Sequence, residues 1–140
     1  MHLKEAVEKG LLPRPTQLIA SPKIRAVQTL SPTARFLSLP LVKSDDLDER
    51  AANEDMISFK KRISKMIESF FSINSSLTSK DVVFLCSHLD WLEEFSNLVP
   101  CDTDLHQISG FQWDPCAYLI FEIQTIWHLT NSGAIKGGLI

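Results

Sequence analysis

Two apolar runs, Gln17-Leu18-Ile19-Ala20 and Val82-Val83-Phe84-Leu85-Cys86, decide the fold that this sequence predicts. Both runs are short, and each is followed at once by a polar turn and a helical pattern. The second run is typical of a strand that is covered on both faces of a parallel sheet. The sequence therefore predicts strands that each lead through a turn into a helix.

The turn after the first run is Ser21-Pro22, which predicts a helix N-cap followed by a proline at the first helical position. The helix that follows is expected to bury three apolar side chains, Ile24, Val27 and Leu30. Because proline lacks an N–H group, Ser31-Pro32 is expected to break this helix or to restart it.

Two further helices follow from apolar spacing. Residues 3–12 place Leu3, Ala6, Val7 and Leu11 on one helical face, and the run ends before Pro13. From Met56 to Phe70 apolar residues recur at steps of three and four, which predicts a well-formed amphipathic helix. A helix over 89–98 is expected directly after the second strand.

The other segments complete a predicted α/β domain. Residues 39–42 are expected to be extended, the acidic stretch Ser44 to Asp55 to be a solvated loop, and Ala117 to Ile123 to be a strand that 125–129 continues after a bend. This order predicts one domain over 1–140, with a mostly parallel sheet sandwiched between helices and antiparallel additions late in the chain. The tail over 131–140 is expected to be loosely ordered.

Composition excludes some partners. The 140 residues are 44% hydrophobic with a net charge of −3, so we expect a globular domain that attracts neither nucleic acid nor an anionic membrane. No apolar stretch approaches the roughly 20 residues of a membrane span, and the first residues lack the apolar core of a signal peptide. A cytoplasmic protein with reduced cysteines is the resulting expectation.

Candidate site residues follow the two strands. In an open α/β sheet, ligands bind beyond the carboxyl ends of the strands, where Ser21 to Arg25 and Ser87-His88 lie. Helix N-termini favour anions there, and an arginine supplies a bidentate fork for phosphate. Taken alone, each residue is better explained without a ligand, Arg25 as a surface arginine and His88 as a histidine that is satisfied by backbone. Their pairing at one edge favours an anion site.

These residues resemble the motifs of a known family. Residues 21–30, Ser-Pro-Lys-Ile-Arg-Ala-Val-Gln-Thr-Leu, closely resemble the SPxxRAxQT segment of the histidine phosphatase superfamily, which is also called phosphoglycerate-mutase-like. Residues 46–49 are similar to its L-x-E segment and residues 59–63 to its FxxRv helix. Residues 82–88 resemble the strand that ends in Ser-His.

The resemblance implies roles for four residues. Family members use two arginines and two histidines around a phosphate, so Arg25 and His88 would stabilise the charge on its oxygens and Ser21 would contribute to binding. Glu49 would be the general acid that protonates the leaving oxygen. Glu49 is equally well one of several carboxylates in a solvated acidic loop.

The family's first strand has no counterpart here. That strand ends in Arg-His-Gly, and its histidine takes the phosphoryl group. His2 does not replace it, because no apolar strand precedes it and no glycine follows it. The expectation is therefore a phosphoglycerate-mutase-like fold that is truncated at the N-terminus and nearly inactive as a 140-residue chain.

The functional prediction is a phosphatase or phosphohistidine-phosphatase-like domain. It would hydrolyse a phosphomonoester or phosphoramidate of a small molecule or a phosphoprotein through a phosphohistidine, with no metal and no organic cofactor. The alternative is a non-catalytic domain that binds phosphate or another protein, for which the only hint would be exposed tryptophans (Trp91, Trp113 and Trp127). Tryptophans in a domain of this size are more often core residues. A weaker alternative is a zinc site made by Cys86, His88, Cys101 and Cys116, whose spacing lacks a ligand knuckle.

Overall fold

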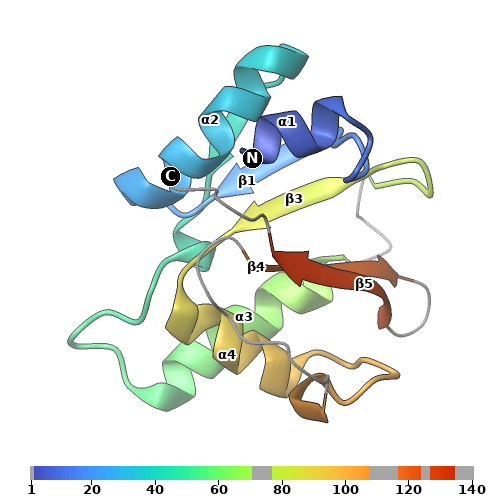
Figure 1. Cartoon of the computed structure of the whole chain (residues 1–140). Coiled ribbons are helices and arrows are strands. Elements are labelled where there is room, and N and C mark those ends of the chain that lie inside the picture. Colours follow the sequence, from blue (N-terminus) through green and yellow to red (C-terminus); the bar gives the residue numbers. More distant parts are fainter. Residues whose placement is uncertain (1, 71–76, 108–116, 124–126, 135–140) are drawn as a thin grey trace. The chain divides into compact units, whose positions relative to one another are not determined.

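The computed structural model describes residues 2–70, 77–107, 117–123 and 127–134 (Figure 1). The chain divides into two compact units. Unit 1 comprises Met1–Glu49, Leu77–His88 and Ile135–Ile140, and unit 2 comprises Arg50–Ser76 and Leu89–Ala134. Both units thus contain segments that are distant in the sequence. The assignment of residues 1–140 to one domain stays a prediction.

Unit 1 contains a parallel sheet of three short strands. These are β1 (Gln17–Ala20), β2 (Leu41–Lys43) and β3 (Val83–Cys86), in the order β2-β1-β3. β1 lies in the middle, and its Ala20 is opposite Lys43 of β2 and Cys86 of β3. The prediction of an α/β chain with parallel strands is confirmed, and all three carboxyl ends lie at one edge of the sheet.

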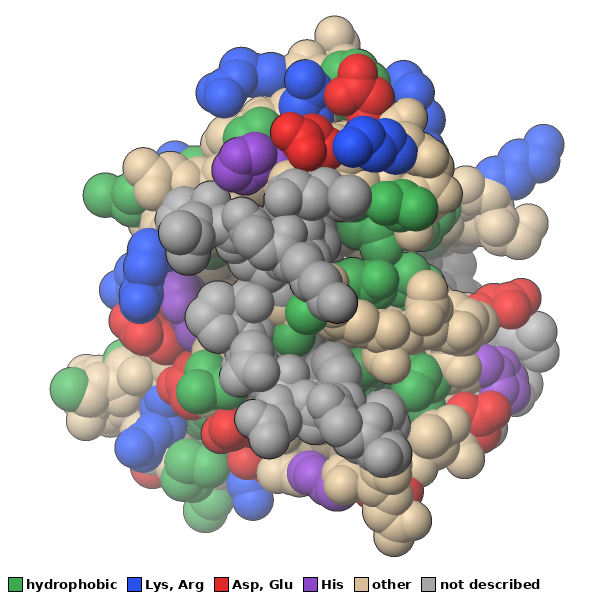
Figure 2. Space-filling view, viewed as in Figure 1, with side chains coloured by type: hydrophobic (Ala, Val, Ile, Leu, Met, Phe, Trp, Pro, Cys, Tyr) green, Lys and Arg blue, Asp and Glu red, His purple; other side chains and the backbone are tan. Residues whose placement is uncertain are grey.

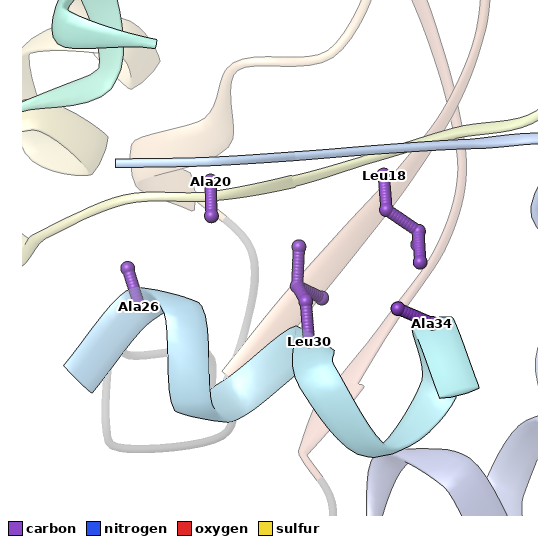
Figure 3. Close-up of a cluster of buried hydrophobic side chains, with 5 residues drawn as sticks. All are labelled: Leu18, Ala20, Ala26, Leu30 and Ala34. Carbon is purple, nitrogen blue, oxygen red and sulfur yellow. The ribbon is translucent and has the colours of Figure 1, made fainter. Parts of the chain in front are cut away.

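Helices α1 (Leu3–Glu8) and α2 (Ile24–Leu37) cover one face of this sheet. Figure 3 shows that the side chains of β1 point toward those of α2. The cluster between them consists of buried residues that are small or of medium size: Leu18, Ala20, Ala26, Leu30 and Ala34. Small residues on the helix allow α2 to approach the strand closely, which fixes the position of the turn that joins the two elements.

Two predictions about α2 were wrong. Ile24 is 72% exposed rather than buried, because the helix directs Ala26 and Leu30 toward the sheet instead. The helix also does not break at Pro32, which lies inside it. A proline in a helix costs roughly 3 kcal/mol, and burial of Leu30 and Ala34 on both sides of Pro32 offsets that cost.

The first helix is also shorter than predicted. α1 ends at Glu8, and Gly10 follows in the left-handed region with φ of 73°, which only glycine adopts readily. This reversal leaves Leu11 59% exposed and buries Leu12, so Leu11 does not belong to the buried face.

Unit 2 contains two helices and an antiparallel pair of strands. Helices α3 (Met56–Ser69) and α4 (Leu89–Leu98) match the predictions closely, and a short 3-10 helix, η2, covers Leu105–Gln107. Strands β4 (Ala117–Ile123) and β5 (Trp127–Ala134) pair antiparallel, as expected for the late part of the chain. Positions 125 and 126 and the tail residues 135–140 lie outside the described residues. The prediction of a loosely ordered tail was wrong for residues 131–134, because they belong to β5 and pair with β4. In the described part of the chain, no helix is long and apolar enough to cross a membrane.

Candidate functional site

The candidate site lies at the carboxyl edge of the sheet in unit 1. Ser21 follows β1 directly, and its N–H donates to the carbonyl of Cys86, the last residue of β3, at 2.9 Å. Ser87 and His88 come next along the chain after β3. The parallel pairing of these two strands therefore brings Ser21 and His88 to the same edge, as predicted for residues that follow the carboxyl ends of parallel strands.

Ser21 and His88 are in direct contact. The Oγ atom of Ser21 lies 2.7 Å from Nε2 of His88, which is hydrogen-bonding distance. Ser21 is fully buried, and the His88 side chain is only 9% exposed. A buried polar pair of this kind fixes the histidine ring relative to β1.

Ser21 is not the N-cap of α2, contrary to the prediction. The N-cap is Lys23, and its side chain forms no capping hydrogen bond. The Ser21 hydroxyl instead accepts a hydrogen bond from the Lys23 N–H group at 3.2 Å, which is a local turn. The reason is that the Ser21 side chain is directed to His88 and is not available to the first turn of the helix.

The acidic segment after β2 is held against the same edge. The Ser44 N–H group donates to the carbonyl of Ala20 at 2.9 Å, and the Ser87 hydroxyl donates to the carbonyl of Leu47 at 2.5 Å. Leu47 is fully buried at the end of a short 3-10 helix, η1 (Asp45–Leu47). The prediction of a solvated loop was therefore wrong for this part, because one apolar side chain and two non-local hydrogen bonds anchor it.

Asp48 is the site residue that the sequence analysis missed. Its Oδ1 atom accepts a hydrogen bond from the Ser21 hydroxyl at 3.4 Å and lies 3.6 Å from Nε2 of His88. Its Oδ2 atom lies 3.8 Å from Nζ of Lys23. The acidic character of residues 44–55 was the only signal in the sequence, and it did not distinguish Asp48 from its neighbours.

Glu49 joins the site through Lys23. Oε1 of Glu49 lies 3.8 Å from Nζ of Lys23, and the Glu49 side chain is 43% exposed. Lys23 thus lies between two carboxylates, those of Asp48 and Glu49. Glu49 is therefore linked to the Ser21–His88 pair through Lys23 and Asp48.

Arg25 lies in the first turn of α2 and is exposed to solvent. Its guanidinium forms no hydrogen bond or ion pair with any residue that the structure describes. The structure therefore places Arg25 on the helix that starts at the site but does not bond it to Ser21 or His88. The first turn of α2 also contains no acidic residue, so its dipole and N–H groups are not neutralised there.

The charges at this edge are mixed. Lys23 and Arg25 are cationic, whereas Asp48 and Glu49 are anionic. The face in Figure 2 likewise displays acidic and basic side chains next to one another. An anion would therefore be bound by individual side chains rather than by a broad positive field.

The three side chains of Ser21, His88 and Asp48 do not form a nucleophilic triad. In a triad, the carboxylate binds the imidazole nitrogen that is opposite the nucleophile. Here Asp48 and Ser21 both approach Nε2 of His88, and the Ser21 hydroxyl is fully buried. The arrangement is suited to holding His88 and not to activating Ser21.

The alternatives from the sequence receive no support in the described residues. Among the residues that the structure describes, no three His, Cys, Asp or Glu side chains form a group able to hold a metal ion. Cys86 and Cys101 are in no disulfide bond among the described residues, and Cys116 lies outside the described residues. Trp91 and Trp127 are core residues, with 1% and 4% exposure, rather than an exposed surface, and Trp113 is outside the described part.

Comparison of the chain with protein-family models, curated proteins and solved structures finds no match. The relationship to the histidine phosphatase superfamily stays a prediction that depends on the motifs in the sequence.

Proposed function

We propose that unit 1 binds the phosphoryl group of a phosphomonoester or phosphoramidate at the carboxyl edge of its sheet. The supporting observation is the 2.7 Å contact between Ser21 and His88, which joins the turns that follow two neighbouring parallel strands. In this proposal His88 donates to a phosphate oxygen and Arg25 supplies a bidentate charged contact, while the buried Ser21 holds the His88 ring in place.

The first turn of α2 supports the same ligand. Its N–H groups have no side-chain cap, and no carboxylate competes for them within that turn. The guanidinium of Arg25, in this turn, forms no hydrogen bond or ion pair with the described residues. A phosphate that binds there would satisfy both the helix end and the guanidinium.

Histidine phosphatase chemistry is the activity that the motifs imply, in a phosphoglycerate-mutase-like fold. That chemistry needs a nucleophilic histidine in addition to His88. The sequence contains three other histidines: His2 is exposed before α1, and His106 and His128 belong to unit 2. We therefore expect the 140-residue chain to bind phosphate and to hydrolyse a generic aryl phosphate no faster than trace levels.

The binding proposal is tested by calorimetric titration with inorganic phosphate and with vanadate. Arg25→Ala and His88→Ala should each weaken binding by about 10- to 100-fold, because each removes a charge-assisted hydrogen bond. Arg35→Ala is the matched control for the arginine, since Arg35 is exposed on the same helix. His106→Ala is the control for the histidine.

Equal binding by the wild type and by both site variants would refute the proposal. Weakened binding in the controls as well would indicate non-specific attraction, which also contradicts it. Release of phosphate from an aryl phosphate at a rate abolished by His88→Ala would instead show that the chain catalyses hydrolysis without a further histidine, which contradicts the expectation of trace turnover.

A further inference from the structure

Among the described residues the Ser21 hydroxyl has three polar neighbours, and their number restricts where the protons are. A hydroxyl donates one hydrogen bond and accepts at most two. The Lys23 N–H group donates to Ser21 Oγ at 3.2 Å, and Oδ1 of Asp48 lies 3.4 Å away as an acceptor. The third neighbour, Nε2 of His88, lies at 2.7 Å.

A carboxylate only accepts hydrogen bonds, so the single hydroxyl proton of Ser21 points to Asp48. The two lone pairs of Ser21 then accept from Lys23 and from His88. This pattern requires a proton on Nε2 of His88. The reverse arrangement, with Ser21 donating to an unprotonated Nε2, would leave Oδ1 of Asp48 facing the lone pairs of the Ser21 oxygen at 3.4 Å and a nitrogen without a proton at 3.6 Å.

We infer that Asp48 is a positioning residue, which acts through the Ser21 hydroxyl to hold His88 in the form that carries its proton on Nε2. The neutral imidazole has two tautomers, and the hydrogen bonds around the ring decide between them. With the proton on Nε2, His88 presents a donor at this edge. With the proton on Nδ1, it would present a lone pair that repels an anion.

The inference deepens the proposed function, on which its statement about anions depends. A phosphate oxygen would compete with Ser21 for the Nε2 proton of His88. Asp48 would then promote phosphate binding through the tautomer although its own charge opposes it. The tautomer is a property of the free protein, so it can be measured without any ligand.

The test is the long-range ¹H–¹⁵N correlation spectrum of the imidazole of His88, recorded without phosphate at alkaline pH and assigned with His88→Ala. The wild type should show the Nε2-protonated pattern. Asp48→Asn should show the same pattern, because the amide oxygen still accepts from Ser21. Asp48→Ala and Ser21→Ala should both lose it, giving the Nδ1-protonated form or a mixture.

Glu49→Gln is the matched control for charge, because Glu49 also pairs with Lys23 but does not accept from Ser21 in the contacts described above. It should leave the tautomer unchanged. A wild-type pattern in Asp48→Ala would overturn the inference, as would its loss in Glu49→Gln. Asp48 also accepts from the Glu49 N–H group at 2.9 Å, so a backbone amide spectrum must first show that Asp48→Ala is folded. If it is not, Ser21→Ala decides.

Titration with inorganic phosphate then separates the inference from the proposed function. Asp48→Ala and Glu49→Gln each remove one carboxylate, so the difference between their phosphate affinities reports the effect of the tautomer and not that of the charge. Asp48→Ala should bind phosphate about tenfold more weakly than Glu49→Gln. Equal affinities would overturn the link to binding. A tautomer that depends on Asp48 in a protein that binds no phosphate would support the positioning role and refute the proposed function.

Discussion

Helices α2 of unit 1 and α3 of unit 2 both contain 14 residues but begin in different ways. The Asp55 carboxylate caps α3 by accepting from the Ser58 N–H group at 2.7 Å. Just before it, Glu54 accepts two hydrogen bonds from Arg62 of the same helix, at 2.8 and 3.0 Å. The start of α2 has no side-chain cap.

The difference is in where the charged and polar groups find partners, within the protein at the start of α3 but not at the start of α2. In unit 2 the helix dipole and the guanidinium of Arg62 are satisfied by carboxylates within the protein. In unit 1 the first turn of α2 and the guanidinium of Arg25 have no such partner among the described residues. We therefore expect substitutions at the two helix starts to change different properties.

The largest expected contrast is between the two arginines. Arg62→Ala should lower the free energy of unfolding of unit 2 by about 1–3 kcal/mol, because it leaves the Glu54 carboxylate, only 18% exposed, without its bidentate partner. Arg25→Ala should change stability by no more than about 0.5 kcal/mol. Amide hydrogen exchange measures each unit separately. Equal losses in the two variants would contradict the comparison.

A smaller contrast is expected between the two N-cap residues. Asp55→Ala removes the capping acceptor of α3 and should lower the melting temperature by about a few degrees. Lys23→Ala removes no cap from α2, since Lys23 forms no capping hydrogen bond, and should leave the melting temperature nearly unchanged. Tryptophan fluorescence reports on unit 2 through the buried Trp91 and Trp127, and circular dichroism follows both helices. A larger decrease in melting temperature for Lys23→Ala than for Asp55→Ala would contradict the assignment of Asp55 as the capping residue that contributes to stability.

Local patterns were sufficient to predict most elements of the fold. The apolar steps over 56–70 predicted α3 almost to the residue, because such spacing depends only on the helix period. The break predicted at Pro32 failed because packing of the neighbouring turns against the sheet outweighs the local cost of a proline. The burial of Ile24 was also mispredicted, since only the three-dimensional position of β1 decides which side of α2 faces the core.

The candidate site was partly predictable, because two of its residues follow strands that are visible in the sequence. Ser21 and His88 each follow a strand, and the parallel pairing of β1 and β3 brings them together without further information. Asp48 was missed because its position depends on the burial of Leu47 and on a hydrogen bond from Ser87, which is distant in the sequence. Contacts of that kind leave no periodic signal in the chain.

Acid should weaken unit 2 through Glu54, which lies just before the start of α3. The hydrogen bond from Arg62 lowers the pKa of Glu54 below its usual value. A carboxyl whose pKa is lower in the folded state contributes stability that is complete above its unfolded pKa and is lost as the pH falls through the folded pKa. Urea unfolding of Glu54→Gln should therefore depend less on pH in the acidic range than that of the wild type.

Some acid sensitivity should remain in that variant. The hydrogen bond with His128, at 2.7 Å, lowers the pKa of Asp102, which is in the same unit. Removing both carboxyl groups, in the double variant Glu54→Gln with Asp102→Asn, should make the free energy of unfolding depend still less on pH. An unchanged acid profile in the double variant would show that these two carboxylates are not what links unit 2 to pH.

The smallest expected effect concerns the buried side of α2. Thr33 is fully buried, and its Oγ1 atom has no hydrogen-bond partner among the described residues. Replacement by valine keeps the branched shape and removes the unpaired hydroxyl, so Thr33→Val should stabilise unit 1 by about 0.5–1 kcal/mol. Thr29→Val is the matched control on the same helix, because the Thr29 hydroxyl donates to the carbonyl of Arg25 at 2.8 Å and gains nothing by removal. Hydrogen exchange of the amides of β1 measures both variants. If Thr33→Val is no more stable than Thr29→Val, the Thr33 hydroxyl has a hydrogen-bond partner. The polar groups on the buried side of α2 would then be paired, in contrast to the uncapped N–H groups of its first turn.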